Sequence, residues 1–291
     1  MELSSQRNSS DIIFVCDFYK SDLDNRGGAE NNDSVLISLL TDQGFKITKK
    51  YCKDISPEFI EENKNLKFII GNFVSLSEES KRSLKKVHYI IYEHDHKYLK
   101  TRDPSKFINF TATDDQIINK DFYKNAKCII CLSNSQAQSV KNNLKISNVE
   151  SIGCSLWSYE KLDYISSISN NLKTKKYCIV NSSNPTKGTF IARKYCESKS
   201  IDYDLIGSNN EKDFLNTLSL YETLIFIPTV LESLCRLVVE AKMLNCSVMT
   251  KPTLIGASSE NWWNLQGDDL IKEIKIKQEE AIKIFINNLG E

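Results

Sequence analysis

The stretch LIFIPTVLESLCRLVVEAKMLNCSVMT, residues 224–250, is the most informative segment of this chain for its fold. It opens with an apolar run that ends at Pro228 and is typical of a strand covered on both faces. A short loop, an apolar helix over residues 233–244 and a second strand over residues 247–250 are expected to follow. A helix that begins at the carboxyl end of a strand directs backbone N–H groups at an anion. The stretch therefore predicts a ligand-binding junction.

Three charged residues of this stretch, Glu232, Arg236 and Glu240, stand four apart, so they would share one stripe of a helix. One interpretation is an ion-pair ladder on a solvated face, which contributes about 0.2–0.5 kcal/mol per pair. The apolar circumference of the helix indicates instead that it is central. Arg236 falls in the first turn, where a cation opposes the helix dipole unless an anion is close. We therefore favour a ligand that is part phosphate and part sugar.

Strand-like and helix-like segments alternate along the whole chain, which indicates an α/β fold with parallel sheets. In open parallel sheets, ligands bind outside the carboxyl ends of the strands. The remaining strands are expected at residues 12–16, 68–70, 87–92, 128–132, 177–180 and 203–206, and the remaining helices at residues 33–43, 78–85, 135–143, 188–198 and 211–220.

A chain of 291 residues is long enough for two modest domains. The polar, aperiodic segment 166–176 predicts a linker between them. We expect an N-terminal domain over residues 1–168 and a C-terminal domain over residues 175–270. The amphipathic tail, residues 271–291, predicts a last helix that crosses back to the first domain.

Composition excludes several classes of protein. The 38 basic and 38 acidic residues balance, so no overall charge attracts nucleic acid. No run of eighteen apolar residues could span a membrane, and the polar start MELSSQRNSSD is not a secretory signal. A cytoplasmic location with reduced cysteines is therefore predicted. Cys128 and Cys131 form a CxxC, but on a strand they point to opposite faces, so no zinc site is expected.

The pattern of Pro228, Glu232, then seven residues, Glu240 and Ala241 resembles the signature of the retaining glycosyltransferases of the two-domain B-type fold, the group 1 or family 4 type. The resemblance implies two Rossmann-like domains facing each other across a cleft. Here the C-terminal domain is shortened, because residues 207–210 lead almost at once into the next helix. In that family the second glutamate, here Glu240, holds the ribose of the nucleotide. The first glutamate, with the amides after it, holds the donor sugar and diphosphate; these are Glu232, Ser233, Leu234, Cys235 and Arg236.

Other parts of the family pattern lie elsewhere in the chain. Gly27 and Gly28 match a GGAE-type loop near the donor phosphate, and His94 matches a histidine that faces the donor sugar. Lys187 and Gly188 match a lysine-glycine pair at the diphosphate. The family's arginine is replaced here by Ser182, and its usual glycine by Cys235. We hypothesise that Arg236 supplies the missing cation, because a guanidinium binds phosphate bidentately.

The resemblance implies transfer of a sugar from a nucleotide-sugar donor to a glycan or lipid-linked acceptor, with retention, for glycan biosynthesis. His94, Lys187 and Glu232 are the expected catalytic residues, with no metal and no cofactor.

Two alternatives remain: an inactive nucleotide-sugar-binding protein, and a metal-dependent hydrolase built on residues 93–96, Glu-His-Asp-His. The Asp202-Tyr203-Asp204 string is interpreted as a chance DxD. Residues 81–106, with eight basic and three acidic residues, predict a solvated face or contact with an anionic membrane.

Overall fold

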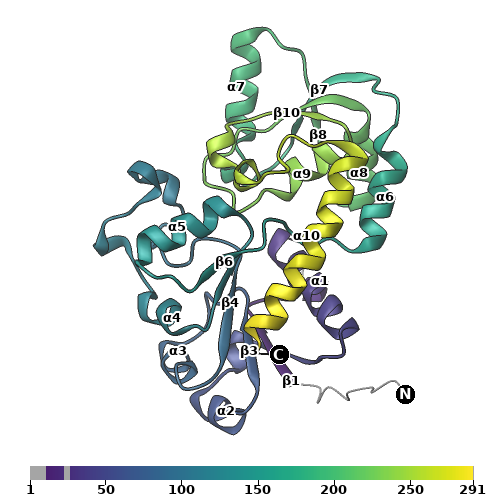
Figure 1. Cartoon of the computed structure of the whole chain (residues 1–291). Coiled ribbons are helices and arrows are strands. Elements are labelled where there is room, and N and C mark those ends of the chain that lie inside the picture. The colour runs from purple at the N-terminus through teal and green to yellow at the C-terminus, as the bar shows by residue number, and fades with distance from the viewer. Residues whose placement is uncertain (1–10, 23–26, 291) are drawn as a thin grey trace, which may run out of the picture.

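The computed structural model describes residues 11–22 and 27–290 and contains two parallel β-sheets (Figure 1). The first sheet has six strands in the order β2-β1-β3-β4-β5-β6, and the second has four in the order β10-β9-β7-β8. Every ladder in both is parallel, which confirms the α/β prediction. The strands are β1 Asp11–Cys16, β2 Lys46–Tyr51, β3 Lys67–Ile70, β4 Tyr89–Glu93, β5 Ile129–Cys131, β6 Val149–Ser151, β7 Lys175–Val180, β8 Asp204–Ile206, β9 Tyr221–Ile225 and β10 Ser247–Met249.

Helices connect these strands, as parallel pairing requires. Half of the α-helices in the described residues begin at a side-chain cap, such as Ser133 before α5, whose Oγ accepts the N–H of Gln136. The α-helices are α1 Gly28–Asp42, α2 Pro57–Glu62, α3 Glu78–Leu84, α4 Lys120–Asn125, α5 Asn134–Leu144, α6 Tyr159–Ser169, α7 Thr189–Lys199, α8 Glu211–Ser219, α9 Arg236–Met243 and α10 Gly267–Asn288.

Both faces of the first sheet are covered, so its central strands are apolar throughout. Cys128 packs into the hydrophobic cluster on one face and Cys131 into the cluster on the other. This confirms the expectation that the two thiols point in opposite directions. Each thiol is buried, and burial raises both pKa values above the ordinary range. Both cysteines therefore behave as small core hydrophobes.

The sequence did not reveal β2 and β6, which lie at the two edges of the first sheet. The segment KITKKY of β2 is half-exposed and mostly polar. An edge strand pairs on one side only and tolerates charge, which also discourages pairing with other chains. The strand β2 therefore lacks the apolar run by which the central strands of this sheet are recognised.

The junction after β9 differs from the expectation in one respect. The helix α9 begins at Arg236 rather than residue 233, because Cys235 has a left-handed backbone with φ of +77°. Glu232 is extended and forms a parallel bridge with Ile255. The prediction that Glu232, Arg236 and Glu240 share one helical stripe is therefore wrong. Only the latter two do, with 3.7 Å between Arg236 Nη2 and the Glu240 carboxylate.

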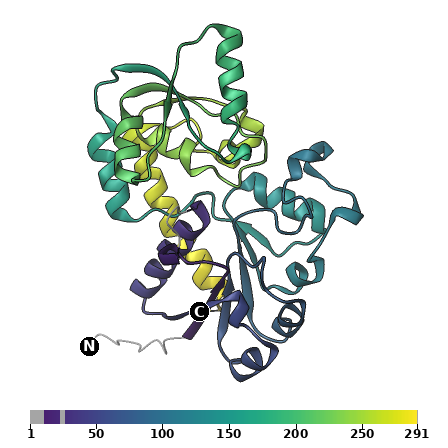
Figure 2. The same cartoon turned by 180° about the vertical axis from the view of Figure 1, so that it is seen from behind.

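Helix α10, yellow in Figures 1 and 2, runs alongside both parts of the molecule. It contacts α6 and α9 of the second part and α1 of the first. Near its end, Phe285 packs edge-on against Tyr92 with ring centroids 5.0 Å apart, and the Asn288 carbonyl lies 2.8 Å from His88 Nε2. The segment expected to be a linker is partly helical, because α6 continues to Ser169.

The carboxyl ends of the two sheets face each other across a pocket of about 650 Å³. The expectation of two Rossmann-like units on either side of a cleft is confirmed. Within the described residues, no helix combines the length and the apolar character needed to cross a bilayer.

Candidate functional site

The pocket is built from the segments that follow strands of both sheets. The first sheet contributes Gly28 after β1, His94 after β4 and Ser155 after β6. The second sheet contributes Lys187 after β7 and Glu232 after β9. The predicted site residues that line this pocket are Gly28, His94, Lys187, Glu232, Ser233, Leu234, Cys235 and Arg236.

Lys187 and Glu232 meet at the second sheet. The Lys187 ammonium donates to both carboxylate oxygens of Glu232, at 2.8 and 3.1 Å. Burial alone would lower the pKa of Lys187, but the Glu232 carboxylate raises it above the usual value. Lys187 therefore stays charged in the pocket, where it is available to an anionic ligand.

The backbone after Lys187 requires a glycine at position 188. Its φ is +67°, and a Cβ at this position would lie 1.7 Å from the carbonyl oxygen of Ile227. The loop after β7 therefore packs directly on the backbone that follows β9, and the Thr229 N–H donates to the Thr186 carbonyl at 3.0 Å. This close approach brings Lys187 to Glu232.

The segment between Glu232 and α9 presents unused backbone donors. Within the described part of the chain, the N–H groups of Ser233, Leu234 and Cys235 donate no hydrogen bond. They precede the first turn of α9 and line the pocket. Free N–H groups before a helix N-terminus form an anion-binding concavity.

His94 is held by a residue that the sequence did not nominate. Its Nε2 lies 2.6 Å from Oδ1 of Asp33 on α1, and both side chains are almost fully buried. The other ring nitrogen, Nδ1, is buried without a hydrogen-bond partner among the described residues. The carbonyl of His94 accepts the Ser233 hydroxyl at 2.5 Å, which ties the two parts of the molecule together at the pocket floor.

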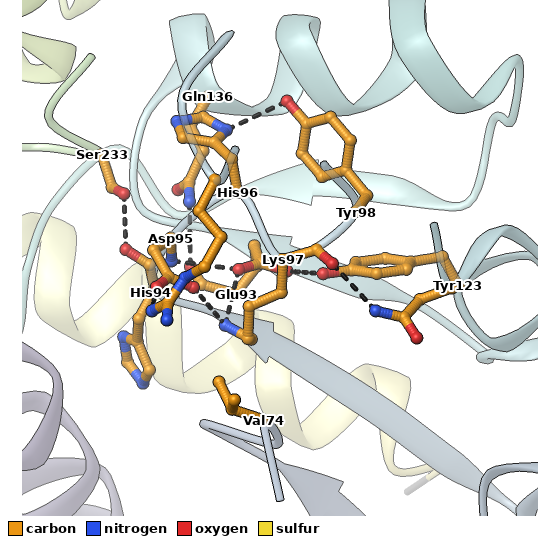
Figure 3. A network of polar contacts seen from close by, with 12 residues as sticks. Val74, Glu93, His94, Asp95, His96, Lys97, Tyr98, Tyr123, Gln136 and Ser233 are labelled. Carbon is orange, nitrogen blue, oxygen red and sulfur yellow. Dashed lines mark hydrogen bonds and ion pairs between the residues drawn. The ribbon is translucent and has the colours of Figure 1, made fainter. Parts of the chain in front are cut away.

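The rest of the loop after β4 forms a polar network (Figure 3). The Glu93 carboxylate accepts from Tyr123, from the Asp95 N–H and from Lys97 Nζ at 2.7 Å. Lys97 also contacts Asp95 at 2.8 Å. His96 turns away towards Tyr98, and burial lowers its pKa to about 3.

This network bears on the hydrolase interpretation of residues 93–96. The four side chains point in different directions, and the carboxylate of Glu93 already accepts three hydrogen bonds. Among residues 11–22 and 27–290, no three His, Cys, Asp or Glu side chains converge as metal ligands.

Arg236 lines the pocket but makes contacts that the sequence did not reveal. Its Nη1 donates to the Leu156 carbonyl at 2.5 Å and lies 3.5 Å from Asn32 Oδ1. The guanidinium also stacks over Trp157, with Cζ 4.5 Å from the ring centroid. Burial lowers its pKa, and Glu240 opposes that change. Arg236 thus links α9 to the first part of the molecule.

Glu240 lies one helical turn further along α9, behind the pocket rather than in its lining. Its Oε1 accepts from Trp157 Nε1 at 2.8 Å and from Lys161 Nζ at 2.7 Å. Burial would raise its pKa, but the charge of Lys161 and that of Arg236 lower it below the usual value. Glu240 is therefore ionised, and it faces inward rather than bulk solvent.

The two glycines at the start of α1 differ in position. Gly27 is the N-cap of the helix and lies outside the pocket lining, whereas Gly28 lines it. A Cβ on Gly28 would lie 3.4 Å from Cδ of Arg236, so the glycine admits the arginine chain. Arg26, which precedes the two glycines in the loop after β1, lies outside the described residues.

Sequence reasoning missed three residues that line the pocket or contact its lining. Asp33 and Asn32 stand on the buried face of α1, where a carboxylate and an amide within an apolar helix were the available signal. Asp103 is buried at the pocket and accepts the Leu231 N–H at 3.3 Å. Its side chain also caps a local turn by accepting the Ser105 N–H at 3.0 Å, so the Asp-Pro-Ser sequence was the available signal. The contact with Leu231, 128 residues further along the chain, had no local signal.

No family model and no curated protein sequence matches this chain. Among solved structures, the chain is similar to Anabaena HepE in complex with UDP and glucose, at 11% identity and a TM-score of 0.48, covering 97% of this chain and 94% of that one.

It is also similar to a glycosyltransferase from Rickettsia africae, at 13% identity and a TM-score of 0.49, covering 97% and 95%. A third similar structure is an alpha-glucosyltransferase in complex with UDP-glucose and DNA containing an abasic site, at 12% identity and a TM-score of 0.47, covering 94% and 91%. Identities this low provide no residue-by-residue correspondence, so the roles of the pocket residues rest on their own geometry.

Proposed function

We propose that this chain is a retaining glycosyltransferase that moves a sugar from a nucleotide-sugar donor to an acceptor hydroxyl. One observation carries the proposal. The Lys187–Glu232 pair lies beside three backbone N–H groups that donate no hydrogen bond, in the pocket at the carboxyl ends of the strands of two facing sheets. A cation and oriented amides suit a diphosphate, and the carboxylate suits sugar hydroxyls.

In the proposed reaction, the acceptor oxygen forms a bond to the anomeric carbon while the bond from that carbon to the diphosphate oxygen breaks. The acceptor proton passes to the departing diphosphate on the same face, which gives retention. The chain supplies positioning and stabilises negative charge on the leaving group, through Lys187 and the amides of residues 233–235. We propose no metal and no cofactor for this chemistry.

The remaining predicted residues receive roles that fit their positions. His94, with Nδ1 unpartnered, would meet the donor sugar, and Gly28 would admit the phosphates. Gly27 fixes the start of α1. Glu240 remains the proposed ribose ligand. Because it lies behind the pocket lining, binding the ribose would require its carboxylate to exchange the contact with Lys161 for one with the ribose.

Specific observations also favour the second candidate, a nucleotide-sugar-binding protein without turnover. Ser182 stands where the family pattern has an arginine, and Arg236, the hypothesised replacement, already donates to the Leu156 carbonyl. Such a protein would bind the donor and release neither free sugar nor product. The chain is proposed to act in the cytoplasm, with its domain boundaries as predicted from the sequence.

A thermal-shift panel of UDP, GDP, ADP and CDP, each with and without an attached sugar, tests the proposal. One diphosphate nucleotide should raise the melting temperature, and Lys187→Ala should abolish the shift. Lys127→Glu, an exposed change at the opposite end of the first sheet, should retain it. Sugar release from the same donor separates the enzyme from the inactive binder. No shift with any nucleotide would contradict both.

Arg236→Ala should raise the donor KM or lower kcat at least about tenfold if the guanidinium replaces the missing cation. Because Arg236 also fixes the Leu156 carbonyl, the melting temperature must be measured in parallel. Unchanged kinetics in a stable Arg236→Ala variant would rule out the replacement.

A further inference from the structure

The charged stripe of α9 holds the crossover segment, residues 152–158, which joins β6 to α6. Arg236 Nη1 donates to a carbonyl of this segment at 2.5 Å, and Glu240 Oε1 accepts from Trp157 Nε1 at 2.8 Å. Lys161, in the first turn of α6, donates to the same Glu240 oxygen at 2.7 Å. The carboxylate proposed to bind the ribose is therefore engaged by the chain itself.

The two oxygens of the Glu240 carboxylate differ in their contacts. Each carboxylate oxygen has about two lone-pair sites, so Trp157 and Lys161 fill Oε1. Oε2 accepts no hydrogen bond from residues 11–22 or 27–290. A ribose presents two neighbouring hydroxyls, and a carboxylate that holds both uses both oxygens. Lys161 thus takes the acceptor site that the second hydroxyl requires.

Lys161 has a second carboxylate within reach. Its Nζ lies 2.6 Å from Glu211 Oε1 at the start of α8, which lies beside α6 in Figure 1. The Glu211 side chain is 54% exposed, whereas that of Glu240 is 9% exposed. Lys161 and Glu211 also line a second pocket, of about 260 Å³, which adjoins the first at Arg236. Lys161 can therefore leave Glu240 and keep an ion pair in a position closer to solvent.

Glu240 also keeps partners when Lys161 moves. Trp157 Nε1 still donates to it, and Arg236 Nη2 lies 3.7 Å from the same oxygen. Removing one partner of a buried ion pair is costly when it leaves the other charge alone. Here a guanidinium and an indole N–H remain, so the buried carboxylate stays compensated. Both positions of the lysine are accessible to the folded chain.

We propose that Lys161 blocks the nucleotide site of the free chain, because its ammonium takes the place of a ribose hydroxyl at Glu240. The inference rests on the proposed function and adds how that site is regulated. The ribose displaces the ammonium towards Glu211. Only those molecules in which Lys161 has turned away bind the nucleoside, so the apparent Kd exceeds the intrinsic Kd by the inverse of their fraction.

Simple electrostatics predicts the opposite effect of removing this lysine. Lys161 is a cation close to a pocket proposed to bind a diphosphate, so its loss should weaken the binding of every anion. A block at Glu240 instead predicts stronger binding, and only for ligands that carry a ribose. Pyrophosphate reaches the amides of residues 233–235 without a ribose, so it should gain nothing.

Calorimetry with UDP, GDP, ADP, CDP and pyrophosphate tests the proposal. Lys161→Met should tighten binding of the nucleotide that the natural chain prefers at least about fivefold, with no gain for pyrophosphate. Lys161→Arg keeps a cation at Glu240 and should retain the natural affinity. Lys212→Met, which removes an exposed lysine of α8 that pairs with Glu160 of α6, is the matched control and should change nothing. Equal or weaker nucleotide binding by Lys161→Met would overturn the proposal.

A second variant should act in the opposite direction. Glu211→Gln, at a half-exposed side chain, removes the alternative partner and leaves Lys161 with Glu240, so nucleotide binding should weaken. Added to Lys161→Met, the same change should have no further effect, because the lysine transmits it. An equal loss in both backgrounds would show that Glu211 contacts the nucleotide directly, and would overturn the proposal.

The proposed function fails separately. Equal nucleotide affinities in the natural chain and in Lys161→Met would remove the block and leave the donor site in place. No nucleotide binding by either chain would remove the donor site, and the block with it.

Discussion

The His94–Asp33 pair is a buried contact between a histidine that lines the first pocket and a carboxylate behind it. Asp33 Oδ1 lies 2.6 Å from Nε2, which fixes the ring, and Nδ1 is buried without a hydrogen-bond partner among the described residues. Asp33 lies behind the histidine on α1, so it acts through His94 by positioning it.

Asp33→Asn should therefore lower kcat about tenfold or more while leaving the affinity for the nucleoside diphosphate unchanged. The reason is that an amide holds the ring less firmly and alters its tautomer. Asp42→Asn, at the exposed end of the same helix, is the matched control and should match the natural chain. A parallel loss of nucleotide affinity would indicate a structural role instead.

His96 makes stability depend on pH. Burial lowers its folded-state pKa to about 3, whereas an unfolded histidine titrates near 6.5. Between these values the unfolded chain binds the extra proton, so the free energy of unfolding falls as the pH falls through this window.

His96→Gln should therefore flatten the dependence of the free energy of unfolding on pH between about 6.5 and 3, as measured by urea titration. An identical slope in the variant and in the natural chain would contradict the buried neutral state of His96.

Among the elements, the loop between β7 and α7 owes its conformation and its packing to Gly188. An alanine there would meet the Ile227 carbonyl and would also occupy a left-handed backbone. Gly188→Ala should therefore destabilise the chain by clearly more than the roughly 1 kcal/mol expected from the backbone alone, and should displace Lys187 from Glu232.

Gly44→Ala provides the matched control in denaturant titration. Gly44 also has positive φ, but a Cβ there would meet nothing within 4 Å. The difference between the two variants thus measures the packing of the loop on β9. Equal losses would show that this close approach is not maintained in solution.

The start of α9 shows how one residue sets an element boundary. Cys235 adopts the left-handed region, which costs a residue other than glycine roughly 1–2 kcal/mol. The hydrogen bonds of the flanking segment hold it there, since Glu232 pairs with Leu254 and Gly256. A glycine would adopt this conformation without that cost, and this chain adopts it with a cysteine.

At the scale of the molecule, Glu260 joins the two parts. Its carboxylate accepts the Asn134 backbone N–H at 2.7 Å and the Asn134 side chain at 2.9 Å, at the N-terminus of α5. Burial raises its pKa, and the Asn134 N–H opposes that change. The adjacent Trp262 donates from Nε1 to the Gly153 carbonyl at 2.8 Å.

Glu260→Ala should loosen this contact and speed amide hydrogen exchange in the first turn of α5 and in residues 256–263, with little change in the sheets. The unsatisfied helix N-terminus is the reason. Glu279→Ala, on the exposed face of α10, should leave exchange in those segments unchanged. Unaltered exchange in Glu260→Ala would show that the two parts stay together without it.

Local periodicity and turn residues in the sequence were enough to predict the α/β class, the central strands and the helices with apolar faces, and to mark the lysine-glycine and glutamate motifs. Which charges meet depends instead on the tertiary structure. Asp33 at His94, Leu156 at Arg236, and Lys161 at Glu240 come from segments about sixty or more residues apart. Pairing across such separations depends on how two sheets dock, and no local pattern records that geometry.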